Sequence, residues 1–280
     1  MRRLEFLICC VFLLSLVGCA PQKRELAKIC FGPADINELI RDLGKSSPTP
    51  FRASGTSQLI YADVEGKKRK ERKERVDVKI WVNPPFDIYL QGDVAFDPRG
   101  LILGANADEF WLALRPNEID SFYSGRWDDA QDGFVAASAG ILLESLGEVN
   151  FADPNEWKMA VSEKFTILAK CRKMEIIKSL IIYNCDRRIR RINYFDNKGE
   201  LAASAEIDDY QRLSDNFFVP HTIKLIGRIG ANFELTLKLG GVKTTQFSEQ
   251  QSEIMFNPPD SSGYKNVYRV IGDKLVELKN

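Results

Sequence analysis

Apolar and polar residues alternate with a period of two along much of the chain after residue 51. The clearest case runs from Phe233 to Leu239, where phenylalanine or leucine occupies every second position. Segments 76–82 and 86–90 alternate in the same way on either side of Pro84-Pro85. Successive side chains of a strand point to opposite faces, so the pattern predicts antiparallel strands with one apolar and one solvated face. Further strands are predicted at 101–103, 109–114, 165–171, 176–184, 189–195, 201–208, 222–228, 242–247 and 267–271.

Two segments have helical periodicity instead. From Glu25 to Leu43, apolar residues recur at steps of three and four, with an interruption at Gly32-Pro33, and Gly44 follows. From Asp129 to Leu146, acidic residues precede a small and apolar interior, which suits the positive end of a helix dipole. We therefore predict one helix before the strands and one inserted among them.

Two helices are few for so many strands. Leaving a broad apolar sheet face in water costs about 25 cal/mol per Å². A sheet that curls around its helices would hide most of this face and leave a groove or cavity suited to acyl chains. A sheet that closes on a well-packed core is the alternative, and the pattern leaves both open.

The first residues predict an exported lipoprotein. Met1-Arg2-Arg3 is basic, and the apolar run from Leu4 to Leu16 is shorter than the roughly 20 residues of a membrane-spanning helix. Leu16-Val17-Gly18-Cys19 resembles the bacterial lipobox, which implies cleavage before Cys19 and attachment of lipid to its sulfur. An uncleaved apolar anchor is the alternative. Ala20, rather than Asp, favours the outer membrane by resemblance to proteobacterial sorting rules.

This interpretation divides the chain. Residues 1–18 are predicted to be the signal peptide and residues 19–24 a lipidated tether. Residues 25–260 form one domain, and residues 261–280 form an extension of open role.

Composition argues against several functions. The chain has 39 basic and 39 acidic residues, whereas a nucleic-acid binder normally has a basic surplus. His221 is the single histidine, and the sequence has no Gly-x-Ser-x-Gly motif, phosphate-binding glycine loop or Cys-x-x-Cys pair. We expect no catalytic residues, no metal and no cofactor. A hydrolase remains an alternative if a carboxylate pair, Asp128-Asp129 or Asp208-Asp209, faces an open polar cleft.

Three cysteines remain after cleavage and lipidation: Cys30, Cys171 and Cys185. An oxidising compartment permits one disulfide and one free thiol among them. Cys171 and Cys185 flank predicted adjacent strands, which favours their pairing and leaves the other pairings open.

A dense run of charge lies between residues 67 and 75. Its basic members are Lys67, Lys68, Arg69, Lys70, Arg72, Lys73 and Arg75. Contact with anionic lipid headgroups, at about 1 kcal/mol per basic residue, is one interpretation, and a solvated face is the other. A second cluster, at Arg187, Arg188, Arg190 and Arg191, lies on a predicted strand pair; with the first it would suit acidic envelope polymers.

Several short motifs occur in a characteristic order. They are Phe51–Gly55, Ile80–Phe86, Asp108–Pro116, Tyr194–Gly199, Val219–His221 and Phe256–Pro259. In this order they resemble the LolA/LolB-like lipoprotein-carrier superfamily, over roughly residues 25–260. The resemblance implies an α+β fold, in which a curved antiparallel half-barrel of about nine to eleven strands has an N-terminal helix and an inserted helix over its concave face.

The resemblance also implies a function. The protein would bind acyl chains of lipids or lipoproteins, with a periplasmic carrier protein as a possible partner and no nucleic acid. A non-catalytic scaffold or sensor that binds another envelope protein is the alternative, since one fold hosts several functions. The cavity wall it implies comprises Ile80, Val82, Phe86, Ile88, Leu90, Trp111, Leu225, Phe233, Leu235 and Leu237.

Two departures from the family pattern stand out. Pro84 occupies the position of an arginine that latches the lid in the periplasmic carrier. The basic run replaces the apolar loop tip of the membrane-anchored receptor.

Overall fold

The computed structural model describes residues 30–44, 48–65, 68–94, 97–115, 120–129, 134–149, 151, 153–227, 233–272 and 274–278. The predicted signal peptide, Cys19 and tether lie outside the described residues and remain predictions. Among the described residues, no helix is both long enough and apolar enough to cross a bilayer.

Fifteen strands lie in the described ranges. The first six are β1 (Phe51–Glu65), β2 (Lys68–Asn83), β3 (Asp87–Val94), β4 (Asp97–Ala105), β5 (Glu109–Leu114) and β6 (Ser121–Arg126). The next five are β7 (Trp157–Val161), β8 (Phe165–Arg172), β9 (Glu175–Tyr183), β10 (Arg188–Phe195) and β11 (Leu201–Arg212). The last four are β12 (Phe218–Gly227), β13 (Phe233–Thr244), β14 (Asn266–Ile271) and β15 (Lys274–Leu278).

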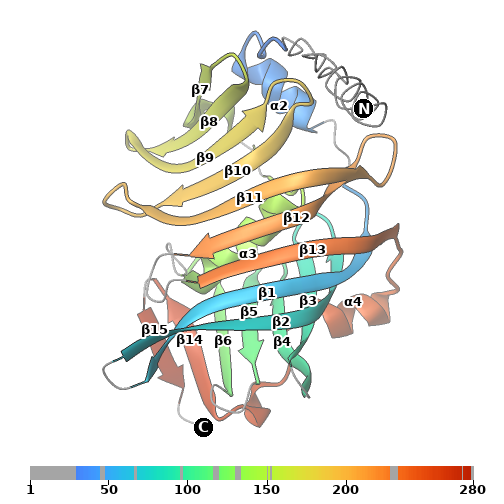
Figure 1. The fold of residues 1–280 in the computed structure, drawn as a ribbon, viewed down its shortest axis with the longest axis vertical. Coiled ribbons are helices and arrows are strands. Elements are labelled where there is room, and N and C mark those ends of the chain that lie inside the picture. Colours follow the sequence, from blue (N-terminus) through green and yellow to red (C-terminus); the bar gives the residue numbers. More distant parts are fainter. Residues whose placement is uncertain are drawn as a thin grey trace, which may run out of the picture.

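All fifteen strands belong to one sheet, in the order β15-β14-β6-β5-β4-β3-β2-β1-β13-β12-β11-β10-β9-β8-β7 (Figure 1). Neighbouring strands are antiparallel except β14 and β6, which are parallel. The protein is therefore mostly β, and the expectation of nine to eleven strands was too low. The sheet is neither closed nor strongly curled, which corrects the expected half-barrel.

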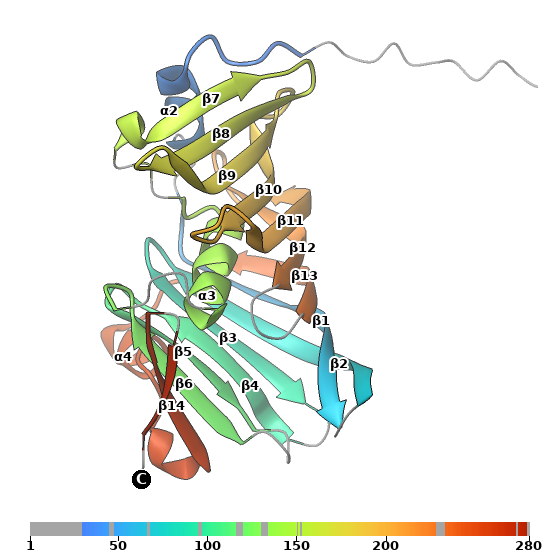
Figure 2. The same ribbon diagram turned by 90° about the vertical axis from the view of Figure 1, so that its left-hand side faces the viewer.

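Three α-helices accompany the sheet in the described ranges: α2 (Ile36–Gly44), α3 (Phe134–Ser145) and α4 (Glu249–Met255). The first two correspond to the two predicted helices, although α2 begins after Gly32-Pro33 and residues 25–29 lie outside the described part. The third was not predicted. Helix α3 packs on β11, β12, β5 and β10, and Figure 2 shows it against one face of the sheet, here called the inner face.

Alternation along the strands builds the core. On β2, Val76, Val78 and Ile80 are buried, whereas Asp77 and Lys79 between them are exposed. Pairing places the same face of β1, β3 and β13 beside these valines, so the inner face carries one continuous apolar core. A smaller cluster lies on the opposite, outer face, where Tyr264 packs with residues of β4, β5, β6 and the neighbouring strand β14.

The hairpin of β1 and β2 extends beyond its neighbours. Strand β3 pairs with β2 only from Asp77 onward, and β13 pairs with β1 only as far as Tyr61. The basic run lies on this projecting part of β2, except Lys67, which lies outside the described residues. Every second residue from 71 to 75 is exposed, namely Glu71, Lys73 and Arg75.

One disulfide joins Cys30 to Cys185, which corrects the favoured pairing of Cys171 with Cys185. Cys171 lies near the turn between β8 and β9, and Cys185 follows the other end of β9. The nine residues of β9 separate the two cysteines by roughly 30 Å, because a strand rises about 3.3 Å per residue. Cys171 is a free thiol.

Candidate functional site

Most of the predicted cavity wall lies in the packed core. Ile80, Val82, Ile88, Leu90, Trp111, Leu225 and Leu237 are at most 2% exposed. Six of these share the inner face, but Trp111 belongs to the outer cluster beside Ile102 and Phe122. Leu235 is half-buried, the side chain of Phe233 is not described, and Phe86 is 47% exposed. The structure thus brings six predicted residues together in the inner-face core and leaves Phe86 at the margin.

An apolar hollow lies at that margin, between α3 and the turn that joins β2 to β3. Its volume is about 550 Å³. Apolar side chains from four segments line it: Phe86, Trp127, Leu143, Val149 and Phe151. Of these, only Phe86 was predicted from the sequence.

Local contacts fix the walls of this hollow. The indole N–H of Trp127 donates to the carbonyl of Asn106 at 2.8 Å, and its ring lies 4.9 Å from that of Phe110. Phe151 packs against Trp157 with ring centroids 5.4 Å apart. The rings of Trp127 and Phe151 are therefore each held by a partner outside the hollow.

A buried polar network anchors α3 to the sheet. Lys178 Nζ of β9 lies 2.6 Å from Glu144 Oε1 of α3, and the hydroxyl of Tyr194 donates to Glu144 Oε2 at 2.6 Å. The Lys178 ammonium also lies 5.3 Å from the ring centroid of Trp157 and 5.6 Å from that of Tyr194. Burial, reinforced by the charge of Glu144, raises the pKa of Tyr194 well above its ordinary value. Tyr194 therefore stays neutral and donates.

Glu148, just beyond α3, also lines the hollow. Its Oε1 atom is buried and has no hydrogen-bond partner among the described residues. Burial raises the pKa of this carboxyl to about 7, from an ordinary value of 4.5. The group is thus poised to change charge near neutral pH.

Replacing Glu148 with glutamine is expected to remove a pH-dependent destabilisation. The folded-state pKa lies above the unfolded one, so wild-type stability falls as the pH rises from 4.5 to about 7, and the loss is complete above that. We compare the free energy of unfolding of Glu148→Gln with that of wild type at each pH. The difference should favour the variant by about 1 kcal/mol more at pH 8 than at pH 4, after allowance for solvent screening. Urea unfolding at both pH values measures this, with Glu200→Gln at an exposed turn as control. An equal difference between Glu148→Gln and wild type at both pH values would refute it.

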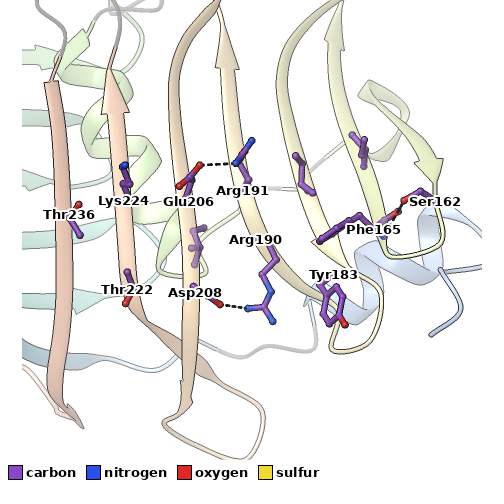
Figure 3. A pocket seen from close by; sticks show the side chains of 13 residues that line it. Ser162, Phe165, Tyr183, Arg190, Arg191, Glu206, Asp208, Thr222, Lys224 and Thr236 are labelled. Carbon is purple, nitrogen blue, oxygen red and sulfur yellow. Dashed lines mark hydrogen bonds and ion pairs between the residues drawn. The ribbon is translucent and has the colours of Figure 1, made fainter. Parts of the chain in front are cut away.

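A larger hollow, of about 890 Å³, lies on the outer face of strands β8 to β13 (Figure 3). A bulge in β10 places the adjacent residues Arg190 and Arg191 on this same face. Arg191 pairs with Glu206 at 2.7 Å, and Arg190 pairs with Asp186 at 2.6 Å and Asp208 at 3.6 Å. We call this hollow the outer groove. Because both guanidinium groups are already paired, neither is free to bind an anion there.

Both carboxylates of the Asp208-Asp209 pair have polar contacts. Asp208 is held by Arg190, and Asp209 accepts a hydrogen bond from Thr222 at 3.4 Å. Within the described ranges, no group of three or more His, Cys, Asp or Glu residues could hold a metal ion.

Comparison with solved structures identifies the type of fold. An outer-membrane lipoprotein-sorting protein domain from Vibrio parahaemolyticus matches with a TM-score of 0.52 and 12% identity, over 80% of this chain and all of that one. The chain shares the fold of that domain. A LolA superfamily protein from Nitrosomonas europaea matches with a TM-score of 0.48 and 8% identity, over 81% of this chain and 99% of that one. A DUF1329 family protein from Desulfovibrio piger matches with a TM-score of 0.46 and 12% identity, over 78% and 94%.

The resemblance found in the sequence motifs is thereby confirmed at the level of the fold. No family model matches the sequence, and no curated protein matches it. The function therefore has to be argued from the site.

Proposed function

We propose that this LolA-like protein binds acyl chains of lipids or lipoproteins in the hollow beneath α3, as a carrier or receptor in the cell envelope. The observation that carries the proposal is the apolar hollow between the inserted helix and the turn that joins β2 to β3. Its volume lies within the roughly 300–1,000 Å³ typical of small-molecule sites. The match to a lipoprotein-sorting domain supports the same function.

In this proposal the predicted wall would continue from the hollow into the core. Phe86 lines the hollow, and Ile88 and Leu225 belong to the buried cluster of the inner face. A long acyl chain would reach them by displacing α3. This helix has no basic residue in its last turn, and Glu144 anchors it to Lys178 of the sheet.

An envelope location fits two further features. The Cys30–Cys185 disulfide is typical of an oxidising compartment. The lipobox at Cys19 would anchor the chain, with the periplasmic face of the outer membrane as its site. The projecting basic hairpin would then contact anionic headgroups, through Lys68, Arg69, Lys70, Arg72, Lys73 and Arg75 together with Lys67.

Blocking the hollow tests the proposal. Phe86→Arg places a charge at its margin, on a side chain that is already 47% exposed, so the fold should tolerate it. We expect affinity for a fluorescent fatty acid to fall about tenfold or more, since burying an unpaired charge beside an acyl chain is costly. Phe31→Arg, at a phenylalanine 83% exposed and outside the hollow, is the matched control.

Native mass spectrometry of protein extracted from membranes provides an independent measurement. The proposal predicts co-purified lipid in the wild type and less in Phe86→Arg. Protein that carries no lipid and also fails to bind fatty acid would refute it.

The second candidate, a scaffold or sensor that binds another envelope protein, is favoured by the outer groove. That groove combines exposed Ile167 with Phe165, Tyr183 and paired charges, a mixture typical of protein interfaces. Photo-crosslinking from Ile167 would recover a partner under this alternative and none under the first.

A further inference from the structure

A second pocket, of about 410 Å³, adjoins the apolar hollow and has six charged residues in its lining. It is framed by the end of α2, the segment after α3, the turn between β9 and β10, and the turn between β11 and β12. Glu148, Val149 and Phe151 line both spaces. A compartment with few charged residues and one rich in them therefore share one short wall, an arrangement that matches a ligand with a tail and a head.

Two buried polar atoms at this pocket lack partners. Arg187 Nη1 and Glu148 Oε1 are buried, and neither has a hydrogen-bond partner in the described part of the chain. The nearest ionic contact of Arg187 is through its other terminal nitrogen, at 3.8 Å from Glu38. An unsatisfied buried polar group costs about 1–3 kcal/mol, so a ligand that satisfies both atoms recovers this cost.

The other charges at the pocket already have partners. Arg188 stacks on Phe218, with its guanidinium carbon 3.7 Å from the ring centroid. Asp186 pairs with Arg190, and Asp215 pairs with Arg212 at 2.8 Å. Among the buried atoms of the described residues at this pocket, Arg187 Nη1 and Glu148 Oε1 therefore remain to be satisfied.

The two unpartnered atoms select the kind of head. A purely anionic head would leave Glu148 Oε1 unsatisfied, and a purely cationic head would leave Arg187 Nη1 unsatisfied. A phosphate suits the guanidinium, and an ammonium suits the carboxylate.

We propose that this pocket binds the zwitterionic head of a phospholipid, with its phosphate at Arg187 and its ammonium at Glu148, while the acyl chains occupy the hollow beneath α3. This inference rests on the proposed function and adds a headgroup preference to it. The raised pKa of Glu148 supports it, because a nearby ammonium would return the carboxyl to its charged form.

Competition between two phospholipids tests the inference. The full chain is incubated with vesicles that contain phosphatidylethanolamine and phosphatidylglycerol in equal amounts and with the same acyl chains, and native mass spectrometry measures the bound ratio. We expect phosphatidylethanolamine to exceed phosphatidylglycerol about tenfold in the wild type. Glu148→Gln should bring the ratio close to one, and Arg187→Gln should weaken binding of both phospholipids.

Binding of a fatty acid distinguishes recognition of the phospholipid headgroup from binding of the acyl chain. Far-UV circular dichroism shows whether each variant is folded, and binding of the fluorescent fatty acid is measured on the wild type. Arg212→Gln, at an arginine paired on the surface near the pocket, should behave as wild type. Equal binding of the two phospholipids by a wild type that binds fatty acid would overturn the headgroup inference alone. Failure to bind any of the three would overturn the proposed function as well.

Discussion

Replacing Lys178 with methionine is expected to lower the free energy of unfolding by about 3–5 kcal/mol, because removal of one partner leaves a buried charge uncompensated. The side chain of Lys178 is 10% exposed and that of Glu144 is 14% exposed. Methionine preserves most of the packing against Trp157 and Tyr194, so lost packing contributes little. Urea unfolding followed by circular dichroism measures the change.

Two controls distinguish the charge from other effects. The double variant Glu144→Gln, Lys178→Met removes both charges and should recover to within about 2 kcal/mol of wild type. Lys224→Met breaks a more exposed pair, with Glu234 at 3.0 Å, and should cost no more than about 1 kcal/mol. If Lys178→Met were no more harmful than Lys224→Met, the network would not anchor α3.

The same network connects stability with function. Glu144 both binds Lys178 and lines the hollow beneath α3. A ligand that displaces α3 must therefore break this pair or carry it along. In Lys178→Met the helix is held more weakly, so acyl chains should enter faster while the protein becomes less stable.

Periodicity predicted the strands that have one buried and one solvated face. Strands β2 and β13 were recovered because alternation is a direct consequence of strand geometry. Strands β6, β7 and β15 were missed. They are five or six residues long, and every residue of β15 is exposed, so no burial pattern marks it.

The start of helix α4 has a recognisable signal in the sequence. Ser248 and Gln251 form a capping box, in which each side chain accepts a hydrogen bond from the other's backbone N–H. A serine followed three residues later by glutamine is a recognised helix start, and it would have placed this helix.

The face of Trp111 could not be inferred from its strand. In β5, Phe110 and Trp111 are adjacent and both fully buried, one on each face. The cluster around Tyr264 and Val267 covers the outer face there, so both faces of β5 are apolar and alternation disappears. Only the tertiary structure, in which α3 packs on β5 from the inner side, shows which residue faces the inner core.

The residues that line the hollow could not be predicted from the sequence for a related reason. Trp127, Val149 and Phe151 lie in connecting segments, where no period links a residue to a face. The sequence therefore predicted the wall of the core, where patterns exist, and missed the margin where the open space lies.

Removal of the Cys30–Cys185 disulfide is expected to lower the free energy of unfolding by about 2–5 kcal/mol. The bond spans 155 residues, so it restricts the unfolded chain strongly, and it ties the segment before α2 to the turn after β9. Unfolding of Cys30→Ser in urea without reductant measures the loss, and wild type unfolded with reductant should match it. Cys171→Ser, which removes only a half-buried free thiol, should stay within about 1 kcal/mol of wild type. The opposite ranking, with Cys171→Ser the more harmful, would instead favour the pairing of Cys171 with Cys185.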